Sequence, residues 1–385
     1  MPLREWQRKL RAVTLKVLHV DTERGWRGGE RQALWLAQEL ARRGHTSVIA
    51  ARVGEPLAGR ASAVGVPVAD CSPVTELDPL AAWRLRRLIR AWQIDVVHAH
   101  TAHAIAVAAF ATSGMRVPLV VSRRVDFALR NNAGTRWKYG RASVIVAISR
   151  AVAGVLERSG ISAEQIRVIP DGVDVARVVT PASRDVLSSL GVPASAPLVV
   201  QVAQLVGHKD PVNFVRAIAR ARSLVPALHA LLVGDGPLRG EVEREVHALG
   251  LDDVVHIAGY RQDADALLAA ADVACLSSRE EGMGSVLLDA LAFGLPIAAT
   301  RAGGIPEVIV DGECGVLADA KNPTALGDAI ARLLTDNALN ARVRANARGR
   351  AAEFSVERMT DRTLAVYEEV VSGTGRDSRT DAANS

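Results

Sequence analysis

Two carboxylates and two glycine-rich turns lie within one short stretch of the sequence. Glu281 precedes Gly282 and Gly284, Asp289 follows, and Gly303-Gly304 opens the next turn. Each turn joins an expected strand to an expected helix, so backbone N–H groups and helix N-termini would face one crevice and favour a phosphate or diphosphate. Carboxylates repel phosphate but accept hydrogen bonds from hydroxyls. The pattern therefore favours a ligand with a diphosphate between two hydroxyl-rich groups, as in a nucleotide sugar.

The residue pattern around these turns resembles that of a known enzyme family. In the family 4 glycosyltransferases, which are retaining enzymes with the two-domain GT-B fold, a Glu is followed after seven residues by a second Glu and then by a Gly-Gly-x-Pro-Glu turn. Glu281, Asp289 and residues 303–307 stand at the matching positions. Similar segments follow in order along the chain: 28–50, 95–101, 144–153, 168–174, 233–243 and 354–370. The resemblance therefore spans nearly the whole chain.

The resemblance implies a donor site built on one lysine and two carboxylates. Lys209 would stabilise the leaving diphosphate as a point charge, Glu281 would contact the donor sugar, and Asp289 would hold the ribose hydroxyls. Two positions depart from the family pattern: Gln204 replaces the usual arginine, and Asp289 is one methylene shorter than the usual glutamate. Gln204 can donate a hydrogen bond to a phosphate oxygen but cannot neutralise it. We therefore expect stabilisation of the leaving group either to be weaker or to be supplied partly by other groups. Solvated side chains on loops are the structural alternative for Lys209 and Glu281.

Other donor contacts are implied by position alone. The helix that begins near Ser285 would direct its N-terminus at the diphosphate. Relatives contact the nucleotide base largely through backbone groups, so the sequence does not identify the base. The remaining implied donor residues are Asp235, Tyr260, Gly282, Met283 and Gly284.

The acceptor side of the cleft is expected in the N-terminal half. Gly28-Gly29 would open the first helix at the cleft, where glycine lets a substrate approach the backbone closely; a plain tight turn is the alternative. Arg27, Glu30 and Arg31 are charged residues beside this turn, and they would face either the cleft or solvent. After the fourth strand many relatives have a histidine implicated in catalysis, but this chain has Arg123-Arg124. Because arginine binds anions bidentately, this pair could bind an anionic acceptor.

Three histidines, His98, His100 and His103, fall at the end of an expected strand. His98 and His100 alternate on one strand face, which would suit a metal ion. No carboxylate or cysteine with ligand spacing accompanies them, so we expect neither a metal nor another cofactor. We expect His100 to line the cleft as a catalytic residue beside Lys209 and Glu281. A packed, hydrogen-bonded imidazole is the alternative.

Short apolar strands alternate with helical patterns along the chain, which is typical of parallel sheets covered by helices on both faces. We therefore predict an α/β protein with two doubly wound, Rossmann-like domains that face a central cleft. Residues 1–178 would form the acceptor-binding domain and residues 179–353 the nucleotide-sugar-binding domain. A helix over residues 354–371 would cross back onto the first domain, and residues 372–385 would form a disordered tail.

The expected elements can be stated by residue range. The strands of the first domain are expected at 16–20, 46–50, 95–99, 119–122, 144–148 and 167–169. Those of the second domain are expected at 198–203, 229–233, 254–258, 273–277 and 297–300. Helices are expected at 29–43, 79–92, 285–293, 322–336 and 338–351.

The composition is that of a globular protein, with 49% hydrophobic and 23% charged residues. Cys71, Cys275 and Cys314 lie far apart in the sequence, which indicates reduced thiols. No apolar run reaches the length of a bilayer span, and the N-terminal segment lacks the apolar region of a signal peptide. We expect a cytoplasmic protein with no nucleic-acid partner.

Charge is divided unequally between the two halves of the chain. Residues 1–180 contain 27 Lys and Arg against 15 Asp and Glu, whereas residues 181–385 contain 20 against 27. Two segments of the basic half, 1–13 and 83–92, combine arginine and tryptophan with a helical pattern. Such helices suit the headgroup region of anionic membranes. A peripheral position on the inner face of a membrane is therefore one hypothesis, and packing of the apolar stripe onto the domain is the other.

Together these observations predict a metal-independent retaining glycosyltransferase that uses a nucleoside diphosphate sugar and a lipid-linked or envelope-glycan acceptor. Gln204, Asp289 and the missing histidine leave open a degenerate relative that binds nucleotide sugar or lipid without turnover. A sugar-nucleotide epimerase of the same fold is a further alternative. A Rossmann dehydrogenase is disfavoured, because the turn at Gly28-Gly29 lacks the G-x-G-x-x-G spacing.

Overall fold

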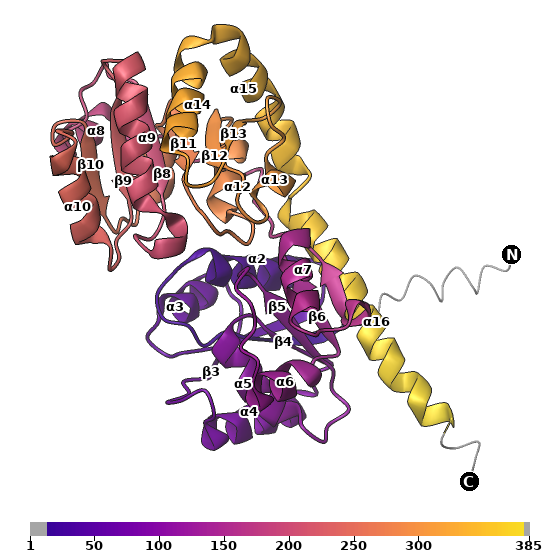
Figure 1. Ribbon diagram of the computed structural model, residues 1–385. Coiled ribbons are helices and arrows are strands. Elements are labelled where there is room, and N and C mark those ends of the chain that lie inside the picture. The colour runs from indigo at the N-terminus through magenta and orange to yellow at the C-terminus, as the bar shows by residue number, and fades with distance from the viewer. Residues whose placement is uncertain (1–13, 381–385) are drawn as a thin grey trace, which may run out of the picture.

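The computed structural model describes residues 14–380, with side chains to residue 373. It consists of two α/β domains, each built on a parallel sheet, and a long helix, α16 (Val356–Thr380). This helix runs from the C-terminal domain down the side of the N-terminal domain (Figure 1). The predicted fold class, two Rossmann-like domains, is confirmed. The basic amphipathic pattern at residues 1–13 lies outside the described residues. No helix among the described residues is long and apolar enough to cross a bilayer.

The N-terminal domain is built on a seven-stranded parallel sheet with the order β3-β2-β1-β4-β5-β6-β7. Its strands are β1 (Lys16–Val20), β2 (Thr46–Ala51), β3 (Val68–Asp70), β4 (Val96–Ala99), β5 (Leu119–Arg123), β6 (Val144–Ala147) and β7 (Ile166–Val168). Its helices are α2 (Gly28–Arg42), α3 (Pro56–Ala63), α4 (Pro79–Trp92), α5 (Ala102–Thr112), α6 (Ala133–Gly140), α7 (Arg150–Arg158) and the 3-10 helix η1 (Ala163–Gln165). The central strands are rich in valine and buried, as parallel strands covered on both faces require.

The C-terminal domain has a six-stranded parallel sheet with the order β10-β9-β8-β11-β12-β13. Its strands are β8 (Leu198–Val202), β9 (His229–Val233), β10 (Val255–Gly259), β11 (Val273–Leu276), β12 (Ile297–Thr300) and β13 (Val316–Ala318). Its helices are α8 (Arg184–Ser189), the 3-10 helix η2 (Gly207–Lys209), α9 (Pro211–Leu224), α10 (Arg239–Ala248), α11 (Ala264–Ala269), α12 (Ser285–Ala292), α13 (Ile305–Val308), α14 (Pro323–Thr335) and α15 (Asn337–Ala352).

The strand order reverses at one point in each sheet. Strand β1 lies between β2 and β4, and β8 lies between β9 and β11, so that consecutive crossovers leave in opposite directions. In open parallel sheets, ligands bind beyond the C-terminal ends of the strands at this switch point. The fold therefore places the ends of β1 and β8 where a ligand site is expected.

Helix α16 ties the C-terminal end of the chain to the N-terminal domain. Met359, Val366, Tyr367 and Val370 join a buried cluster with residues of β1 and β4, which confirms the predicted crossover. The helix begins at Val356 and continues to Thr380. The structure therefore corrects the expected boundary at residue 371 and the expected disordered tail as far as residue 380; residues 381–385 lie outside the described part.

Candidate active site

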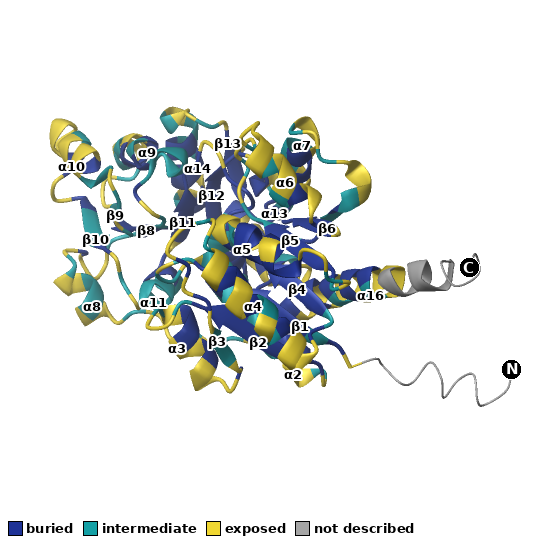
Figure 2. Ribbon diagram, turned by 90° about the horizontal axis from the view of Figure 1, so that it is seen from below, coloured by how far each residue is buried: buried dark blue, intermediate teal, exposed yellow. Residues whose placement is uncertain are grey.

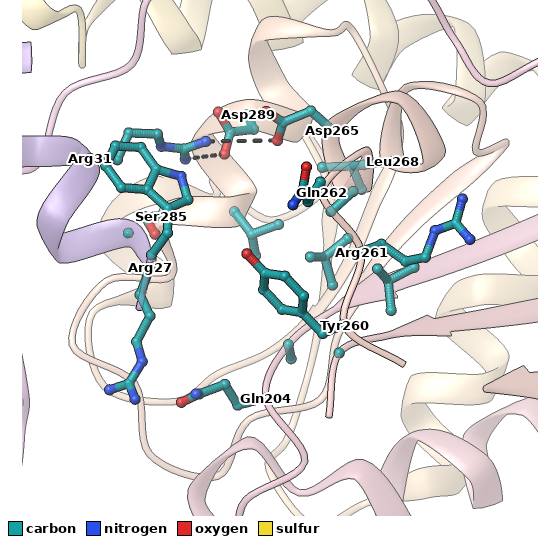
Figure 3. A pocket seen from close by; sticks show the side chains of 18 of the residues that line it. Arg27, Arg31, Gln204, Tyr260, Arg261, Gln262, Asp265, Leu268, Ser285 and Asp289 are labelled. Atoms are coloured by element: carbon teal, nitrogen blue, oxygen red, sulfur yellow. Dashed lines mark hydrogen bonds and ion pairs between the residues drawn. The ribbon is translucent and has the colours of Figure 1, made fainter. Parts of the chain in front are cut away.

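A cavity of about 310 Å³ opens between the two domains, at the switch point of the C-terminal sheet (Figure 3). One wall comes from α2 and the loops beside it, and the other from residues that follow β8, β9 and β10 and from the start of α12. Seven residues predicted from the sequence line this cavity together: Gly28, Gln204, Lys209, Tyr260, Gly284, Ser285 and Asp289.

The N-termini of two helices from different domains meet in this cavity. Helix α2 begins at Gly28 and α12 at Ser285, and a Cβ atom on Gly28 would lie only 2.6 Å from Ser285 Oγ. Gly284 has a φ of 80°, a backbone conformation that favours glycine. Helix N-termini carry unpaired N–H groups and a partial positive charge. This part of the cavity therefore suits an anion such as a diphosphate.

Lys209 and Glu281, both predicted as catalytic, form an ion pair with each other. Lys209 is the last residue of η2, and Glu281 lies on the loop that leads into α12. Their side chains are 20% and 11% exposed, and Ser278 Oγ donates a second hydrogen bond to Glu281 at 3.0 Å. This burial disfavours the solvated-loop alternative. A ligand that bound Lys209 or Glu281 would therefore have to replace the other residue of this ion pair.

Two arginines to which the sequence analysis gives no site role hold Asp289. Arg31 of α2 pairs with one carboxylate oxygen of Asp289 (Figure 3). Arg177 of the interdomain linker donates to the other oxygen at 2.9 Å. Asp265 of α11 lies 3.7 Å from Arg31 and 2.8 Å from Arg177. Burial opposes the charge of Arg31, but Asp289 together with Asp265 and Asp171 outweighs burial, so the pKa of Arg31 lies above its usual value. The predicted ribose-binding carboxylate is thus tied to the N-terminal domain.

The second glycine turn packs against the first turn. The Gly304 N–H donates to the Glu281 carbonyl at 2.9 Å, and a Cβ on Gly303 would lie 1.9 Å from that oxygen. Gly282 lies against the N-terminal domain, where a Cβ would come within 2.3 Å of the Arg124 carbonyl. The expectation that both turns face one crevice is therefore wrong for the second turn, whose glycines serve close backbone packing.

Glu307, the last residue of the Gly-Gly-x-Pro-Glu turn, caps a helix of the other domain. Its two carboxylate oxygens accept the N–H groups of Arg150 and Ala151 at 2.9 and 3.0 Å. Ser149 Oγ accepts the next N–H, that of Val152, at 3.1 Å, and donates to the Gly282 carbonyl at 2.7 Å. The free N–H groups at the start of α7 thus have hydrogen-bond acceptors from both domains. Sequence reasoning missed this contact, because it joins segments far apart in the chain.

His100 is buried, with 3% of its surface exposed. Its Nε2 lies 3.0 Å from His19 Nδ1, while the nitrogens of His98 bond the Tyr367 hydroxyl at 2.6 Å and Ser122 Oγ at 2.8 Å. Burial lowers the pKa of all three imidazoles, that of His19 to about 3. The structure contradicts the expectation that His100 lines the cleft as a catalytic residue and favours the packed, hydrogen-bonded alternative.

The same three histidines are the one group of metal-ligand type among the described residues, with ligand atoms within 4.8 Å of one another. Both nitrogens of His98 already hold hydrogen-bond partners. Arg124 Nη1 lies 3.5 Å from His100 Nδ1, and its positive charge would oppose a cation nearby. His103 lies apart from the group, exposed and 3.4 Å from Glu23. These contacts favour hydrogen-bonded imidazoles.

Arg123 and Arg124 are held by protein groups. Arg124 Nε donates to the buried carboxylate of Asp171 at 3.1 Å, and Arg123 Nη2 donates to the Phe127 carbonyl at 2.6 Å. Neither side chain lines the interdomain cavity, and Gly29 lies next to Arg124 outside that lining. The structure therefore places this pair as support for a loop that contacts the C-terminal domain, and it gives no support to direct binding of an acceptor.

Four of the implied donor residues lie outside the cavity lining: Asp235, Glu281, Gly282 and Met283. Glu281 reaches the site only through its ion pair with Lys209. Met283 is 2% exposed and belongs to the core, and Gly282 contacts the other domain. Asp235 accepts the Gly236 N–H at 2.7 Å and an Arg239 N–H at 3.3 Å. Tyr260 lines the cavity and is exposed.

The cavity lining also includes residues without a predicted ligand contact, among them Trp26, Arg60, Gln262 and Asp265. Arg27 and Arg31, left between cleft and solvent by the sequence analysis, both line it. The adjacent Gly28-Gly29 turn was the available signal for these two arginines. Nothing in the sequence indicates Arg177, which reaches Asp289 from the linker.

Comparison with known proteins identifies two sequence families in succession. Residues 26–177 match Glycosyltransferase Family 4, and residues 185–350 match the glycosyl transferases group 1 family. The lipopolysaccharide core biosynthesis glycosyltransferase LpsE of Rhizobium meliloti is 34% identical over 203 residues, which are 52% of this chain and 57% of that protein. The D-inositol 3-phosphate glycosyltransferase of Corynebacterium jeikeium is 30% identical over 302 residues, which are 75% of this chain and 69% of that protein. The chain spans 53% to 66% of the length of three such relatives.

Solved structures share the fold over nearly the whole chain. Anabaena Alr3699/HepE, solved in complex with UDP, has a TM-score of 0.79 at 24% identity and covers 92% of this chain and 100% of its own. A glycosyltransferase from Rickettsia africae has a TM-score of 0.79 at 22% identity, with 93% and 99% covered. With both family matches and this two-domain fold, the chain belongs to the family 4, group 1 glycosyltransferases.

Proposed function

We propose that this protein transfers a sugar, with retention of anomeric configuration, from a nucleoside diphosphate sugar to an acceptor hydroxyl. One observation carries the proposal: two helix N-termini, Lys209 and Asp289 meet in a single interdomain cavity. The diphosphate would lie at the helix N-termini and Lys209, and the ribose at Asp289. Glu281, paired with Lys209, would bind the sugar hydroxyls. The UDP-glucose complex of the Anabaena protein supports a donor of this class.

Catalysis by this arrangement would rest on charge stabilisation. When the bond between sugar and diphosphate breaks, negative charge grows on the leaving phosphate, where the ammonium of Lys209 and the N–H groups of α12 stabilise it. The walls of the cavity come from both domains, so their approach would exclude water from the reacting sugar. The side chains proposed for these steps supply charge and hydrogen bonds and require no metal.

We further propose a lipid-linked or envelope-glycan acceptor. The lipopolysaccharide core relative supports it, as does the charge of the N-terminal half, whose 27 Lys and Arg exceed its 15 Asp and Glu. Other relatives are named for smaller acceptors, D-inositol 3-phosphate and L-malate. These names share an anionic acceptor, so a basic acceptor domain fits either class.

The donor proposal is tested first by thermal shift against a panel of uridine, guanosine and adenosine diphosphate sugars. Lys209→Ala and Glu281→Ala should each weaken binding of the best donor at least tenfold, because a charge-assisted contact contributes about 1.5–3 kcal/mol. Lys321→Ala is the matched control, since Lys321 is exposed and outside the cavity. Wild-type affinity in both site variants would remove Lys209 and Glu281 from the donor site.

Turnover separates the alternatives. Release of nucleoside diphosphate that depends on an acceptor extract supports transfer, and NMR of the product then reports its anomeric configuration. Binding without release would identify a degenerate relative. Conversion of the donor sugar without an acceptor would identify an epimerase.

A strip of exposed apolar side chains supports peripheral binding to an anionic membrane. Leu77, Trp83, Phe110 and Trp137 lie where α4, α5 and α6 meet, and exposed positions run along α4 in Figure 2. The rings of Phe110 and Trp137 lie 4.4 Å apart. Helix α4 buries alanines, Leu85 and Ile89 against the domain but leaves its two tryptophans exposed. Packing of the apolar residues onto the domain, the alternative to membrane binding, therefore accounts for only one face of α4.

Basic residues surround this apolar strip. Arg86 lines the groove beside Trp83, Arg87 lies 4.9 Å from the Trp83 ring, and Arg130 and Lys138 line the groove beside Trp137. Aromatic side chains at headgroup level together with several cations favour an anionic bilayer over a neutral one. We propose such a bilayer as the occupant of this surface.

Cosedimentation with anionic and neutral vesicles tests the surface. We expect salt-sensitive binding to anionic vesicles, reduced at least fivefold in Trp83→Ser/Phe110→Ser. The matched control is Leu224→Ser/Leu249→Ser, which changes two exposed leucines of the C-terminal domain. Protein that stays in the supernatant with anionic vesicles at low salt would contradict the membrane proposal and favour a small or dispersed acceptor.

A further inference from the structure

Five cationic side chains line the interdomain cavity among the described residues: Arg27, Arg31, Arg60, Lys209 and Arg261. Four of them have a partner within the protein. Lys209 pairs with Glu281, Arg31 with Asp289, and Arg261 with Asp263, while Arg60 lies over the Trp26 ring at 4.4 Å. Arg27 is exposed at the cavity and forms no ion pair with a described residue, although the carboxylate of Glu30 is near enough to interact with its charge. It is therefore the cation of this group that is available to a ligand.

Arg27 is positioned for the phosphate end of the site. It directly precedes Gly28, the first residue of α2, so its side chain leaves the chain at a helix N-terminus. In Figure 3 its guanidinium points along the cavity toward Gln204. Both residues line the cavity with Lys209 and Ser285. The guanidinium, the lysine and the two helix N-termini thus bring positive charge to the same region from both domains.

The charges of the C-terminal wall explain why an added cation is needed there. Gln204, which follows β8, is neutral. The charge of Lys209 is partly offset by Glu281. A departing diphosphate gains negative charge, and a guanidinium can bind phosphate oxygens through two N–H groups. The C-terminal domain alone therefore provides little net positive charge for the leaving group.

We propose that Arg27 binds the leaving diphosphate and supplies, from the N-terminal domain, the positive charge that Gln204 does not. This inference rests on the proposed function. In the transfer step, the bond between the sugar C1 and the phosphate oxygen breaks, and its electron pair stays on that oxygen. The acceptor hydroxyl oxygen bonds to C1, and its proton passes to the departing diphosphate. Arg27 stabilises the charge on the diphosphate and forms no bond to the sugar.

Calorimetry with phosphate-bearing and phosphate-free probes tests the assignment. UDP, GDP and ADP are titrated into the full chain beside uridine, guanosine and adenosine. Arg27→Gln should weaken the best nucleoside diphosphate tenfold to a hundredfold and leave its nucleoside within twofold. Arg27→Lys should retain part of the affinity. Arg244→Gln, which changes an exposed arginine outside the cavity, should alter either probe less than threefold.

A rescue variant makes the test specific to charge. Arg27→Gln/Gln204→Arg returns one guanidinium to the cavity from the opposite wall, so it should recover at least half of the lost binding free energy. Because Gln204 is not charged, Gln204→Arg alone should preserve or increase turnover.

Two results would overturn the inference. Wild-type affinity for nucleoside diphosphate in Arg27→Gln would show that Arg27 does not bind the phosphates. Equal loss for diphosphate and nucleoside, without rescue, would show that Arg27 supports the structure of the pocket. If the wild-type chain binds none of the three nucleoside diphosphates, the proposed function fails, and the role of Arg27 fails with it.

Discussion

Arg31 of the N-terminal domain and Asp289 of the C-terminal domain form an ion pair across the interdomain cavity. Arg177 and Asp265 complete a group of two cations and two anions around it. The side chain of Asp289 is 3% exposed, and those of Arg31 and Arg177 are 15% and 23% exposed. The carboxylate proposed to bind ribose is therefore also an interdomain link, so in the proposed function nucleotide binding and domain contact would depend on the same oxygens.

Replacement of Asp289 should affect stability as well as nucleotide binding. Asp289→Asn leaves Arg31 and Arg177 to share Asp265, and we expect a loss of about 1–3 kcal/mol in the free energy of unfolding, moderated by the partial exposure of both arginines. Asp289→Glu keeps the charge and should lose less. Urea unfolding at two salt concentrations measures the effect. Unchanged stability of Asp289→Asn would show that Asp265 alone satisfies the arginines.

Most of the fold could be predicted from periodic patterns. Strands β1, β9 and β12 and helix α4 have the predicted bounds, since each combines an apolar run with a clear start or stop. Strands β3 and β13 were not predicted. Each has only three residues and lies at an edge of its sheet, so its pairing depends on its neighbour more than on its own sequence.

The site was less predictable, because its contacts join distant segments. The lining role of Lys209, Gly284 and Asp289 follows from turn positions and family resemblance. The partners of Asp289, by contrast, come from α2 and the linker, which no local pattern connects to α12. The alternation of His98 and His100 along the strand was clear from the sequence. Whether His100 is open or covered depends instead on His19 and Arg124, which come from other segments of the chain.

Removal of the Glu307 cap should destabilise the start of α7. Glu307→Ala leaves the N–H groups of Arg150 and Ala151 without their acceptors, and loss of a helix cap costs roughly 0.5–2 kcal/mol. Hydrogen exchange should increase in the peptide that contains these amides. Glu353→Ala, which changes an exposed glutamate paired with Arg350, is the control. Equal exchange in both variants would show that the capping contact contributes little.

Asp21 should make the wild-type chain less stable as the pH rises toward 8. It is 1% exposed, one oxygen accepts the Glu23 N–H at 3.1 Å, and the other has no partner among the described residues. Burial, with the nearby charge of Glu30, raises the pKa of Asp21 to about 7. Because this folded value lies above the unfolded value of 3.8, the stability that it contributes is full below pH 3.8 and is lost as the pH rises through 7.

Asp21→Asn cannot ionise, so it should exceed the wild type in stability at pH 8 by at most roughly 4 kcal/mol, at about 1.4 kcal/mol per pKa unit. The difference should shrink toward zero near pH 4. Urea unfolding across this range measures it, with exposed Asp253→Asn as the control. A difference that does not vary with pH would mean that Asp21 is ionised in the folded protein.

The buried histidines should have the opposite effect on stability. His19, His98 and His100 have folded pKa values below 6.5, because burial disfavours their charged forms. As the pH falls below 6.5, the unfolded chain binds protons that the folded chain does not. Each histidine therefore removes about 1.4 kcal/mol of stability per pH unit until its folded pKa is reached.

The Asp21→Asn background is suited to measuring this loss, because it lacks the opposing titration of Asp21 in the same pH range. There we expect the free energy of unfolding to fall between pH 6.5 and 4.5. His19→Gln should reduce this slope by about 1.4 kcal/mol per pH unit, since one buried imidazole no longer titrates. His247→Gln changes a histidine whose side chain is 84% exposed and should leave the slope unchanged. An equal slope in the His19 and His247 variants would show that His19 accepts a proton in the folded protein and that the cluster is open to water.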